Sequence, residues 1–240
     1  NMTAVKDKNK QIERMFHAGA HFGYSKSRRH PSVSEFIFGT KNRVEILDLE
    51  KTNELLQEAK AFVEKLGQEK KTLLFVGSKN EGRDVIKNTA ISLDMPYVSG
   101  RWIGGTITNF PQIKKRIERL EELSEQREKG ELSKYTKKER LLIDREIEKL
   151  ETNFLGLLPI KEKLPDALFV VDVKHENIAV TEARKAGIPV VSVSNSDCDM
   201  TGVNYPIVAN DATLGSIKFF TDEIAEAYRE GLKKEEVTKS

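Results

Sequence analysis

The chain of 240 residues contains one cysteine, one tryptophan and no long apolar run. The single Cys198 excludes a disulfide framework within the chain and is compatible with a reducing cytosol. No apolar stretch approaches the ~20 residues of a membrane-spanning helix, and the N-terminus has no apolar signal-peptide region. We therefore expect a soluble, cytoplasmic protein that does not associate with membranes.

Positive charge is concentrated near the N-terminus. The net charge is only +2, but residues 1–43 contain nine Lys and Arg against three acids. Aromatic residues are interspersed among these cations: Phe16, Phe22, Tyr24, Phe36 and Phe38. A solvated basic tail would not need the aromatics, so this segment is predicted to face a polyanion.

Most of the chain alternates between apolar strands and amphipathic helices. Strands are expected at residues 72–76, 96–99, 167–171, 190–193 and 205–208, and helices at 52–66, 81–93, 177–186 and 212–231. Strands that are apolar throughout are buried on both faces. The pattern predicts an α/β three-layer sandwich with a mainly parallel five-stranded sheet. Gly67 and Gly187 are expected to end the helices that precede them.

The N-terminal residues do not follow this alternation. Residues 1–10 are polar and are expected to be disordered or weakly helical, and residues 11–18 are expected to form a short helix. Residues 36–38 and 44–47 are predicted to form a β-hairpin or two short strands, with residues 39–42 between them.

Residues 111–155 contain no strand signal. Their apolar residues follow a 4,3 spacing, and mixed charge surrounds them, with twelve Lys and Arg against eleven acids. Thr136 and Glu139 form a capping-box pattern that marks a helix start. We predict an inserted antiparallel helical hairpin of coiled-coil type, whose balanced charge favours bracing or protein contact.

These patterns predict a division of the chain into four parts. Residues 1–43 form a basic N-terminal segment with a short helix and the start of the β-hairpin. Residues 44–110 and 156–232 form the α/β sandwich, residues 111–155 the inserted hairpin, and residues 233–240 a polar tail.

The stretch RWIGGTITNF, residues 101–110, carries the strongest functional signal. It places Trp102 beside Arg101 on a backbone freed by Gly104 and Gly105, which suits base stacking and phosphate contact. The alternative is a loop that buries Trp102 and Phe110 under the sheet. No nucleophile, general base or metal ligand set is present in this stretch.

Other patterns give weaker alternatives. Residues 77–84 have the outline of a phosphate loop, but Arg83 and Asp84 replace its Lys and Ser/Thr, so nucleotide binding is a minor alternative. An acid–base set at Asp172, His175 and Glu176 has no matching nucleophile. A metal site is a further minor alternative, either at His17, His21 and His30 or at Asp197, Cys198 and Asp199.

Several motifs together resemble one known family. They are GAHFG at residues 19–23, FIFG at 36–39, DLEKT at 48–52, LFVGSK at 74–79, RWIGGTITNF at 101–110 and LPDALFVVD at 164–172. In this order, and over about residues 11–231, the chain is similar to the bacterial small-subunit ribosomal protein S-two family (universal uS-two).

The resemblance implies a flavodoxin-like fold with an inserted helical hairpin and no catalytic activity, cofactor or metal. It also implies a monomeric structural constituent of the small ribosomal subunit. Such a protein binds rRNA on the solvent side between head and body, contacts neighbouring ribosomal proteins and helps to recruit ribosomal protein S-one. The residues predicted to bind RNA are His21, Lys26, Arg28, Arg29, Arg43, Arg101, Trp102, Asn109, Lys114 and Lys115. A nucleotide-binding enzyme and a free cytosolic adaptor remain the alternative classes.

Overall fold

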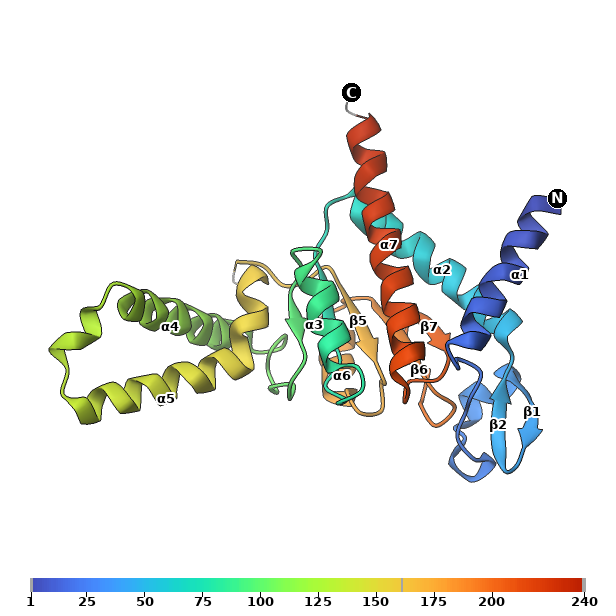
Figure 1. Ribbon diagram of the computed structural model, residues 1–240, viewed down its shortest axis with the longest axis horizontal. Coiled ribbons are helices and arrows are strands. Elements are labelled where there is room, and N and C mark those ends of the chain that lie inside the picture. Colours follow the sequence, from blue (N-terminus) through green and yellow to red (C-terminus); the bar gives the residue numbers. More distant parts are fainter. Residues whose placement is uncertain (1, 161, 239–240) are drawn as a thin grey trace.

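The computed structural model describes residues 2–160 and 162–238, and Figure 1 shows the order of their elements. The N-terminal part contains α1 (Met2–His17), η1 (Lys26–Arg28), η2 (Pro31–Phe36), β1 (Ile37–Lys41) and β2 (Val44–Leu47). There follow α2 (Leu49–Gln68), β3 (Leu73–Val76), α3 (Arg83–Ile91), β4 (Tyr97–Val98), α4 (Phe110–Glu128), η3 (Glu131–Lys134) and α5 (Lys137–Phe154). The last elements are η4 (Leu155–Ile160), β5 (Ala167–Val171), α6 (Asn177–Lys185), β6 (Val190–Ser194), β7 (Tyr205–Val208) and α7 (Leu214–Thr238).

The main sheet has five strands in the order β4-β3-β5-β6-β7, and all neighbouring strands are parallel. Every residue of β3, β5 and β6 is buried, as strands covered on both faces require. The order corresponds to the 2-1-3-4-5 arrangement of flavodoxin-like proteins. The predicted α/β fold class is confirmed.

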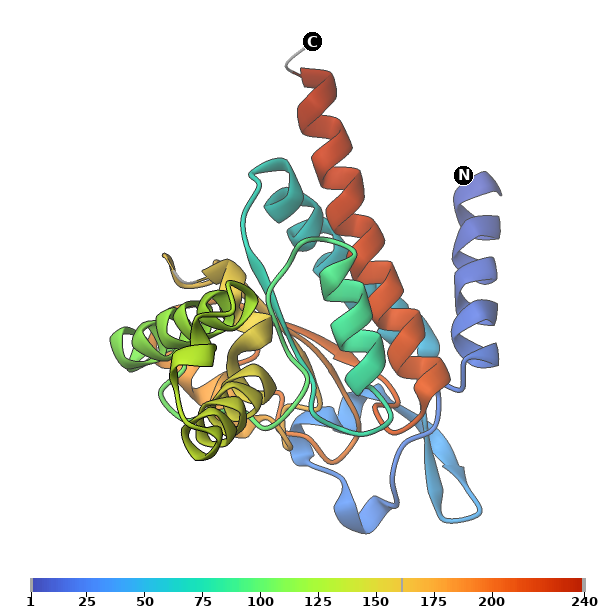
Figure 2. The ribbon, with the colours of Figure 1, turned by 60° about the vertical axis from the view of Figure 1, so that its left-hand side comes forward.

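Two cores fill the space on either side of this sheet. On one face, Phe75 and Phe169 pack with residues of α2, α3 and α7 such as Phe220. On the other face, Leu74 and Val170 pack with α6, Trp102 and the base of the hairpin. Figure 2 shows α3 and α7 running alongside each other over the first face. The alternation of strand side chains between the two cores produces the three layers.

Long-range contacts extend several helices beyond the predicted bounds. The helix α2 continues through Gly67 to Gln68, because Gly67 packs against the backbone of α7 at Tyr228 and Gly231. The expected helix end at Gly67 is therefore wrong: this glycine allows a close crossing of two helices. Helix α7 runs to Thr238, so the predicted polar tail is helical as far as the structure describes it.

Helix α1 begins at Met2, whereas the sequence predicted residues 1–10 to be disordered or weakly helical and a short helix at residues 11–18. Its contacts explain the difference. Lys8 pairs with Glu54 of α2 at 3.6 Å, and Arg14 pairs with the buried Glu223 of α7 at 3.0 Å. This polar helix is stable because ion pairs with α2 and α7 add stability that its own helix propensity does not provide.

The inserted hairpin projects from the body as two antiparallel helices, α4 and α5 (Figure 1). Its seam is buried where the 4,3 spacing predicted it, with Ile117 and Ile147 fully enclosed. The capping box is present: the Thr136 hydroxyl accepts from the Glu139 amide, and the Thr136 amide donates to the Glu139 carboxylate. Each of these features follows from local sequence.

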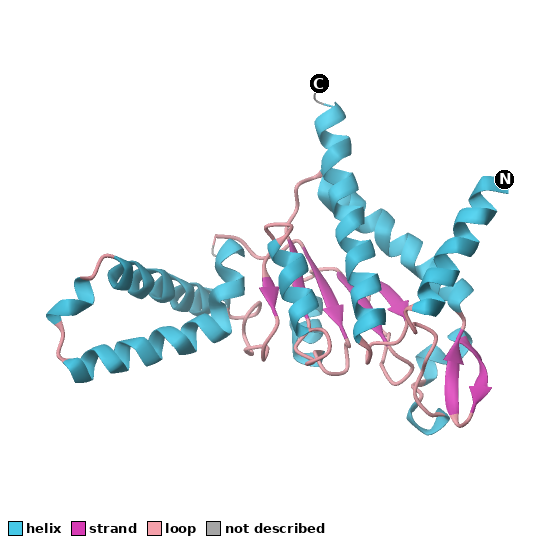
Figure 3. Cartoon of the chain, in the orientation of Figure 1, coloured by secondary structure: helices cyan, strands magenta, loops and turns pink. Residues whose placement is uncertain are grey.

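Residues 18–48, which we call the N-terminal lobe, carry a separate two-stranded sheet, β1 and β2 (Figure 3). Its turn consists of Asn42 and Arg43, with φ of 51° and 67°. The predicted connection at residues 39–42 is wrong, because residues 39–41 belong to β1. Side chains after β6 and β7 hold the lobe to the body: Asn195 donates to the Phe22 carbonyl at 3.3 Å and Asn210 to the Gly19 carbonyl at 3.0 Å.

None of the helices in the described ranges is both long and apolar enough to cross a membrane.

Candidate nucleic-acid interface

The loop of residues 101–109 is wrapped around one carboxylate, that of Glu182 on α6. Glu182 is only 6% exposed. Its donors are Trp102 Nε1 at 3.2 Å, Gly105 N at 2.7 Å, Ile107 N at 3.0 Å, and Thr108 N and Oγ1 at 3.0 and 3.1 Å. Burial alone would raise the pKa of Glu182, but these hydrogen bonds outweigh it and hold the pKa below its ordinary value. The ionised carboxylate therefore fixes the loop that leads into α4.

This arrangement corrects the prediction for Trp102. The indole is 5% exposed and belongs to the core, so the expectation of an exposed ring that stacks on a base is wrong. Its neighbour Arg101 is exposed and makes no hydrogen bond or ion pair with the described residues. Asn109 is also exposed at the start of α4, where its side chain makes no capping bond. The loop thus buries its aromatic and presents its polar side chains.

Sequence reasoning missed Glu182. The residue lies on the buried face of α6, three positions after Ala179 and one before Ala183. An acid on an apolar helix face was the available signal, because such a group must find donors inside the protein. The identity of those donors, about 75 residues earlier, was not visible in the sequence.

Lys79, in the loop after β3, is bound by two buried acids. Its ammonium lies 2.5 Å from Asp172 Oδ2 and 3.1 Å from Asp211 Oδ1. Burial and the negative charge of Asp172 raise the pKa of Asp211 to about 6, although Lys79 acts in the opposite direction. Asp172 also accepts from the amides of Lys174 and His175, both at 3.0 Å.

These contacts argue against both enzyme alternatives, the nucleotide-binding loop and the acid–base set. Lys79, one cation of the loop after β3, is engaged inside the protein. The Ser78 amide and hydroxyl both donate to the buried carboxylate of Glu176, the amide at 2.9 Å. Asp172 and Glu176 are therefore hydrogen-bonded parts of the sheet edge and not an open acid–base set.

The structure gathers one group of metal-binding side chains in the described part of the chain, and it is neither predicted trio. Donor atoms of Asp172, Cys198 and Asp211 all lie within 4.8 Å of one another. The Lys79 ammonium already lies against both carboxylates and offsets part of their negative charge. Burial and the nearby carboxylates raise the pKa of the Cys198 thiol, which disfavours the thiolate that a metal would need.

The N-terminal lobe binds two of its three acids internally, leaves the third, Glu35, exposed, and exposes four of its five Lys and Arg side chains. Glu45 is fully buried and pairs with Arg29 at 3.1 Å, and Asp48 caps the start of α2. The exposed cations of the lobe are Lys26, Arg28, Lys41 and Arg43. No ion pair to the described residues holds any of them, whereas Arg29 has a structural partner.

Two of the lobe's predicted RNA-binding residues lie against aromatic rings. The Arg28 guanidinium is 5.5 Å from the centroid of the Tyr24 ring. His21 is stacked between Phe16 and Phe22, at centroid distances of 4.4 and 4.1 Å. Burial lowers the pKa of His21, so this imidazole is neutral at pH 7 and is not a phosphate-binding cation. We call Phe16, His21 and Phe22 the aromatic ladder.

The remaining candidates begin the hairpin. Lys114 pairs with Glu162 at 3.2 Å, and Lys115 is exposed. The predicted RNA-binding residues thus fall into two groups, one on the lobe and one around the base of the hairpin. The main sheet lies between the two groups (Figure 1).

Comparison with known proteins decides the family. A family model described as "Ribosomal protein S2" matches residues 15–231 of the chain. The chain belongs to the ribosomal protein S2 family. The small ribosomal subunit protein uS2 of Sulfurimonas denitrificans is 43% identical over 217 residues, which cover 90% of this chain and 83% of the relative.

Further relatives agree with this assignment. The uS2 protein of Coprothermobacter proteolyticus is 43% identical over 92% of this chain and 82% of its own length. That of Nitratiruptor sp. is 42% identical over 90% of this chain and 81% of its own length. These names are those of a structural ribosomal protein and not of an enzyme.

Proposed function

We propose that this chain is a structural, non-catalytic component of the small ribosomal subunit that binds rRNA through its N-terminal lobe. The supporting observation is the separation of charge in the lobe. Of its three acids, Glu45 and Asp48 serve the fold and Glu35 is exposed, while Lys26, Arg28 and Arg43 remain exposed and unpaired among the described residues. Exposed cations of this kind displace counterions from phosphates, and the resulting affinity falls steeply with salt.

The finer placement rests on the family resemblance. It implies an rRNA site on the solvent side of the subunit, between head and body, in the cytoplasm of a bacterium. The residues that we expect at this site are Lys26, Arg28, Arg43, Arg101, Asn109 and Lys115. Trp102 is omitted because it is buried, Arg29 because Glu45 holds it, Lys114 because Glu162 pairs with it, and His21 because it is neutral.

The test is incorporation into small subunits. The triple variant Lys26→Ala, Arg28→Ala, Arg43→Ala should co-sediment weakly with small subunits, and the salt dependence of its binding should lose roughly 2 units of slope. The matched control replaces three exposed hairpin cations, Lys137, Lys138 and Arg145, by Ala. Equal incorporation of both triple variants and the wild-type chain, with intact small subunits, would contradict the proposal.

Recruitment of ribosomal protein S-one is a second part of the proposal. The aromatic ladder supports it, since Phe16 and Phe22 are 56% and 47% exposed and rings of this kind anchor protein interfaces. The double variant Phe16→Ala, Phe22→Ala should still enter subunits but should bind added S-one weakly. Leu141→Ala with Leu142→Ala, at two exposed apolar positions of the hairpin, is the control. Unchanged S-one binding by the ladder variant would remove this role.

A further inference from the structure

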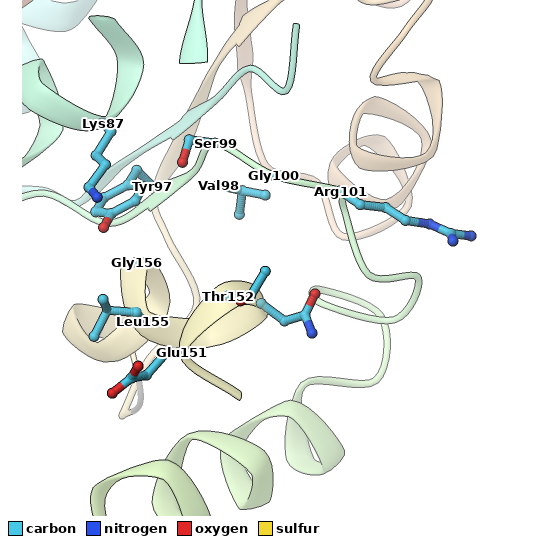
Figure 4. Close-up of a pocket in the computed structure, with 11 residues that line it drawn as sticks. Lys87, Tyr97, Val98, Ser99, Gly100, Arg101, Glu151, Thr152, Leu155 and Gly156 are labelled. Atoms are coloured by element: carbon cyan, nitrogen blue, oxygen red, sulfur yellow. The ribbon is translucent and has the colours of Figure 1, made fainter. Parts of the chain in front are cut away.

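Three hollows follow one another along the carboxyl edge of the main sheet. The first, of about 250 Å³, lies between the segment after β4 and the base of α5, with Lys87 on its rim (Figure 4). The second, of about 370 Å³, lies between the loops after β3 and β5. The third, of about 430 Å³, reaches Tyr24 of the N-terminal lobe.

These hollows form one groove because they share lining residues. Arg101 lines the first and the second, while Ser78 and His175 line the second and the third. In Figure 4 the Arg101 guanidinium extends away from Tyr97 and Leu155, on the outer side of the first hollow. The second hollow lies where the chain order of the sheet reverses between β3 and β5. Open α/β sheets bind their ligands at this switch point.

The second hollow carries more positive than negative charge. Arg83 enters it from the first turn of α3, Arg101 from the segment after β4, and His175 from the loop after β5. Arg101 has no polar partner within the described ranges, and within them the Arg83 side chain donates only to the neutral Asn80, at 3.1 Å. The acid of this hollow, Glu176, is 3% exposed and accepts from Ser78. Two arginines thus line this hollow together with one buried carboxylate.

The neighbouring hollows differ in character. Lys79 of the third hollow is held by Asp172 and Asp211, and Glu81 adds an exposed negative charge, so that hollow is unsuited to a phosphate. It offers the Tyr24 ring, next to which Arg28 lies. In the first hollow, Lys87 is exposed, and the acid Glu151 is paired with Arg127 at 3.0 Å.

We propose that this groove binds a single-stranded segment of RNA, with one phosphate held between Arg83 and Arg101 in the second hollow. The inference rests on the proposed ribosomal function and deepens it: Arg83 joins the expected RNA-binding residues, and Arg101, already among them, is assigned a phosphate. Arg pairs hold a phosphate by bidentate hydrogen bonds, and the aromatic face of Tyr24 lies where the base of a following nucleotide would stack. Lys87 and Arg28 continue the positive charge toward the two ends of the groove.

The experiment measures binding of a fluorescent oligouridylate of about eight nucleotides to the full chain, by anisotropy over a series of salt concentrations. The double variant Arg83→Ala, Arg101→Ala should bind roughly tenfold more weakly and lose about 1.4 units of salt slope. The variant Arg83→Lys, Arg101→Lys keeps the charge but loses the bidentate geometry, so it should recover the slope and only part of the affinity.

The control variant Arg116→Ala, Arg145→Ala removes two exposed arginines of the hairpin that have no polar partner in the described part of the chain. Equal weakening by the control, or wild-type affinity in the groove variant, overturns the inference. Uridine monophosphate that binds as tightly as the oligomer also overturns it, because the groove would then be a mononucleotide site. Thermal unfolding of each variant verifies that the fold is intact.

Sedimentation with small subunits separates this inference from the proposed function. If the wild-type chain co-sediments and the groove variant binds the oligomer normally, the groove inference fails and the ribosomal function stands. If the wild-type chain does not co-sediment with intact small subunits, the proposed function fails whatever the groove binds.

Discussion

The inserted hairpin and the N-terminal lobe lie beyond opposite edges of the same sheet, and they present charge differently (Figure 1). In the hairpin, cations and acids are nearly equal in number, and the pairs Arg119–Glu146 and Arg127–Glu151 join its two helices at 3.2 and 3.0 Å. In the lobe, Glu45 and Asp48 serve the fold, Glu35 is exposed, and four of the five Lys and Arg side chains are exposed. The net charge of a region therefore indicates its capacity to bind RNA less well than the positions of the acids that pair with its cations.

The two regions are also attached to the sheet by different means. The root of the hairpin is the loop held by the single carboxylate of Glu182, with five donors. The lobe is held by scattered amide contacts from Asn195 and Asn210, and by the Tyr24 amide, which donates to Ser196 Oγ at 2.9 Å. Damage to one residue should therefore affect the hairpin root more than the lobe.

The largest expected effect comes from Glu182→Ala. The change leaves five donors without their acceptor, three on buried or half-buried residues and two on the exposed Thr108, and we expect the free energy of unfolding to fall by about 4 kcal/mol. Urea denaturation measures it, with Glu148→Ala at an exposed site of α5 as the control. A loss of less than about 1 kcal/mol would mean that the loop does not depend on this carboxylate.

The pH dependence of stability sharpens the same point. Because the folded pKa of Glu182 lies below its ordinary value, the charged form stabilises the folded state. That stabilisation is complete above the ordinary glutamate pKa and is lost as the pH falls toward the folded pKa. Glu182→Gln should therefore lose less stability than the wild type on acidification below about pH 4.5, as followed by urea midpoints.

An intermediate effect is expected within the lobe, where Arg29 and Arg28 are adjacent but differ in role. Arg29→Ala leaves the charge of Glu45 buried and unpaired, so the free energy of unfolding should fall by about 3 kcal/mol. Arg28→Ala should change it by less than about 1 kcal/mol but should weaken RNA binding.

The double variant Arg29→Ala, Glu45→Gln tests the cause. It should be more stable than Arg29→Ala, because the buried charge is removed with its partner. If the single and double variants unfold at the same urea concentration, the ion pair is not the reason for the loss.

The smallest expected change in stability is a gain. Arg43 adopts a φ of 67°, a left-handed conformation that glycine accepts more easily. Arg43→Gly should leave the free energy of unfolding unchanged or raise it by up to about 1 kcal/mol, yet RNA affinity should fall. Lys41→Gly, in the adjacent strand, is the control and should cost about 0.5–1 kcal/mol. Unchanged RNA affinity in Arg43→Gly would remove the hairpin turn from the interface.

Much of the fold could be predicted because its signals are local. The strands β5 and β7 have the bounds that the apolar runs indicated, and the capping box at Thr136 marks the start of α5. The candidate site was harder to predict from the sequence. The predicted RNA-binding residues include both exposed and internally bound side chains, and only partners distant in the sequence distinguish them.

The sequence by itself determined the parallel sheet, the helical hairpin and the basic N-terminal lobe, because apolar periodicity, capping and net charge are properties of adjacent residues. Only the tertiary structure decided which polar groups face solvent. Trp102 is buried because Glu182 binds it from α6, and Lys79 is unavailable because Asp172 and Asp211 meet at the sheet edge. A buried polar group must be paired, and its partner can come from any part of the chain that the fold brings near.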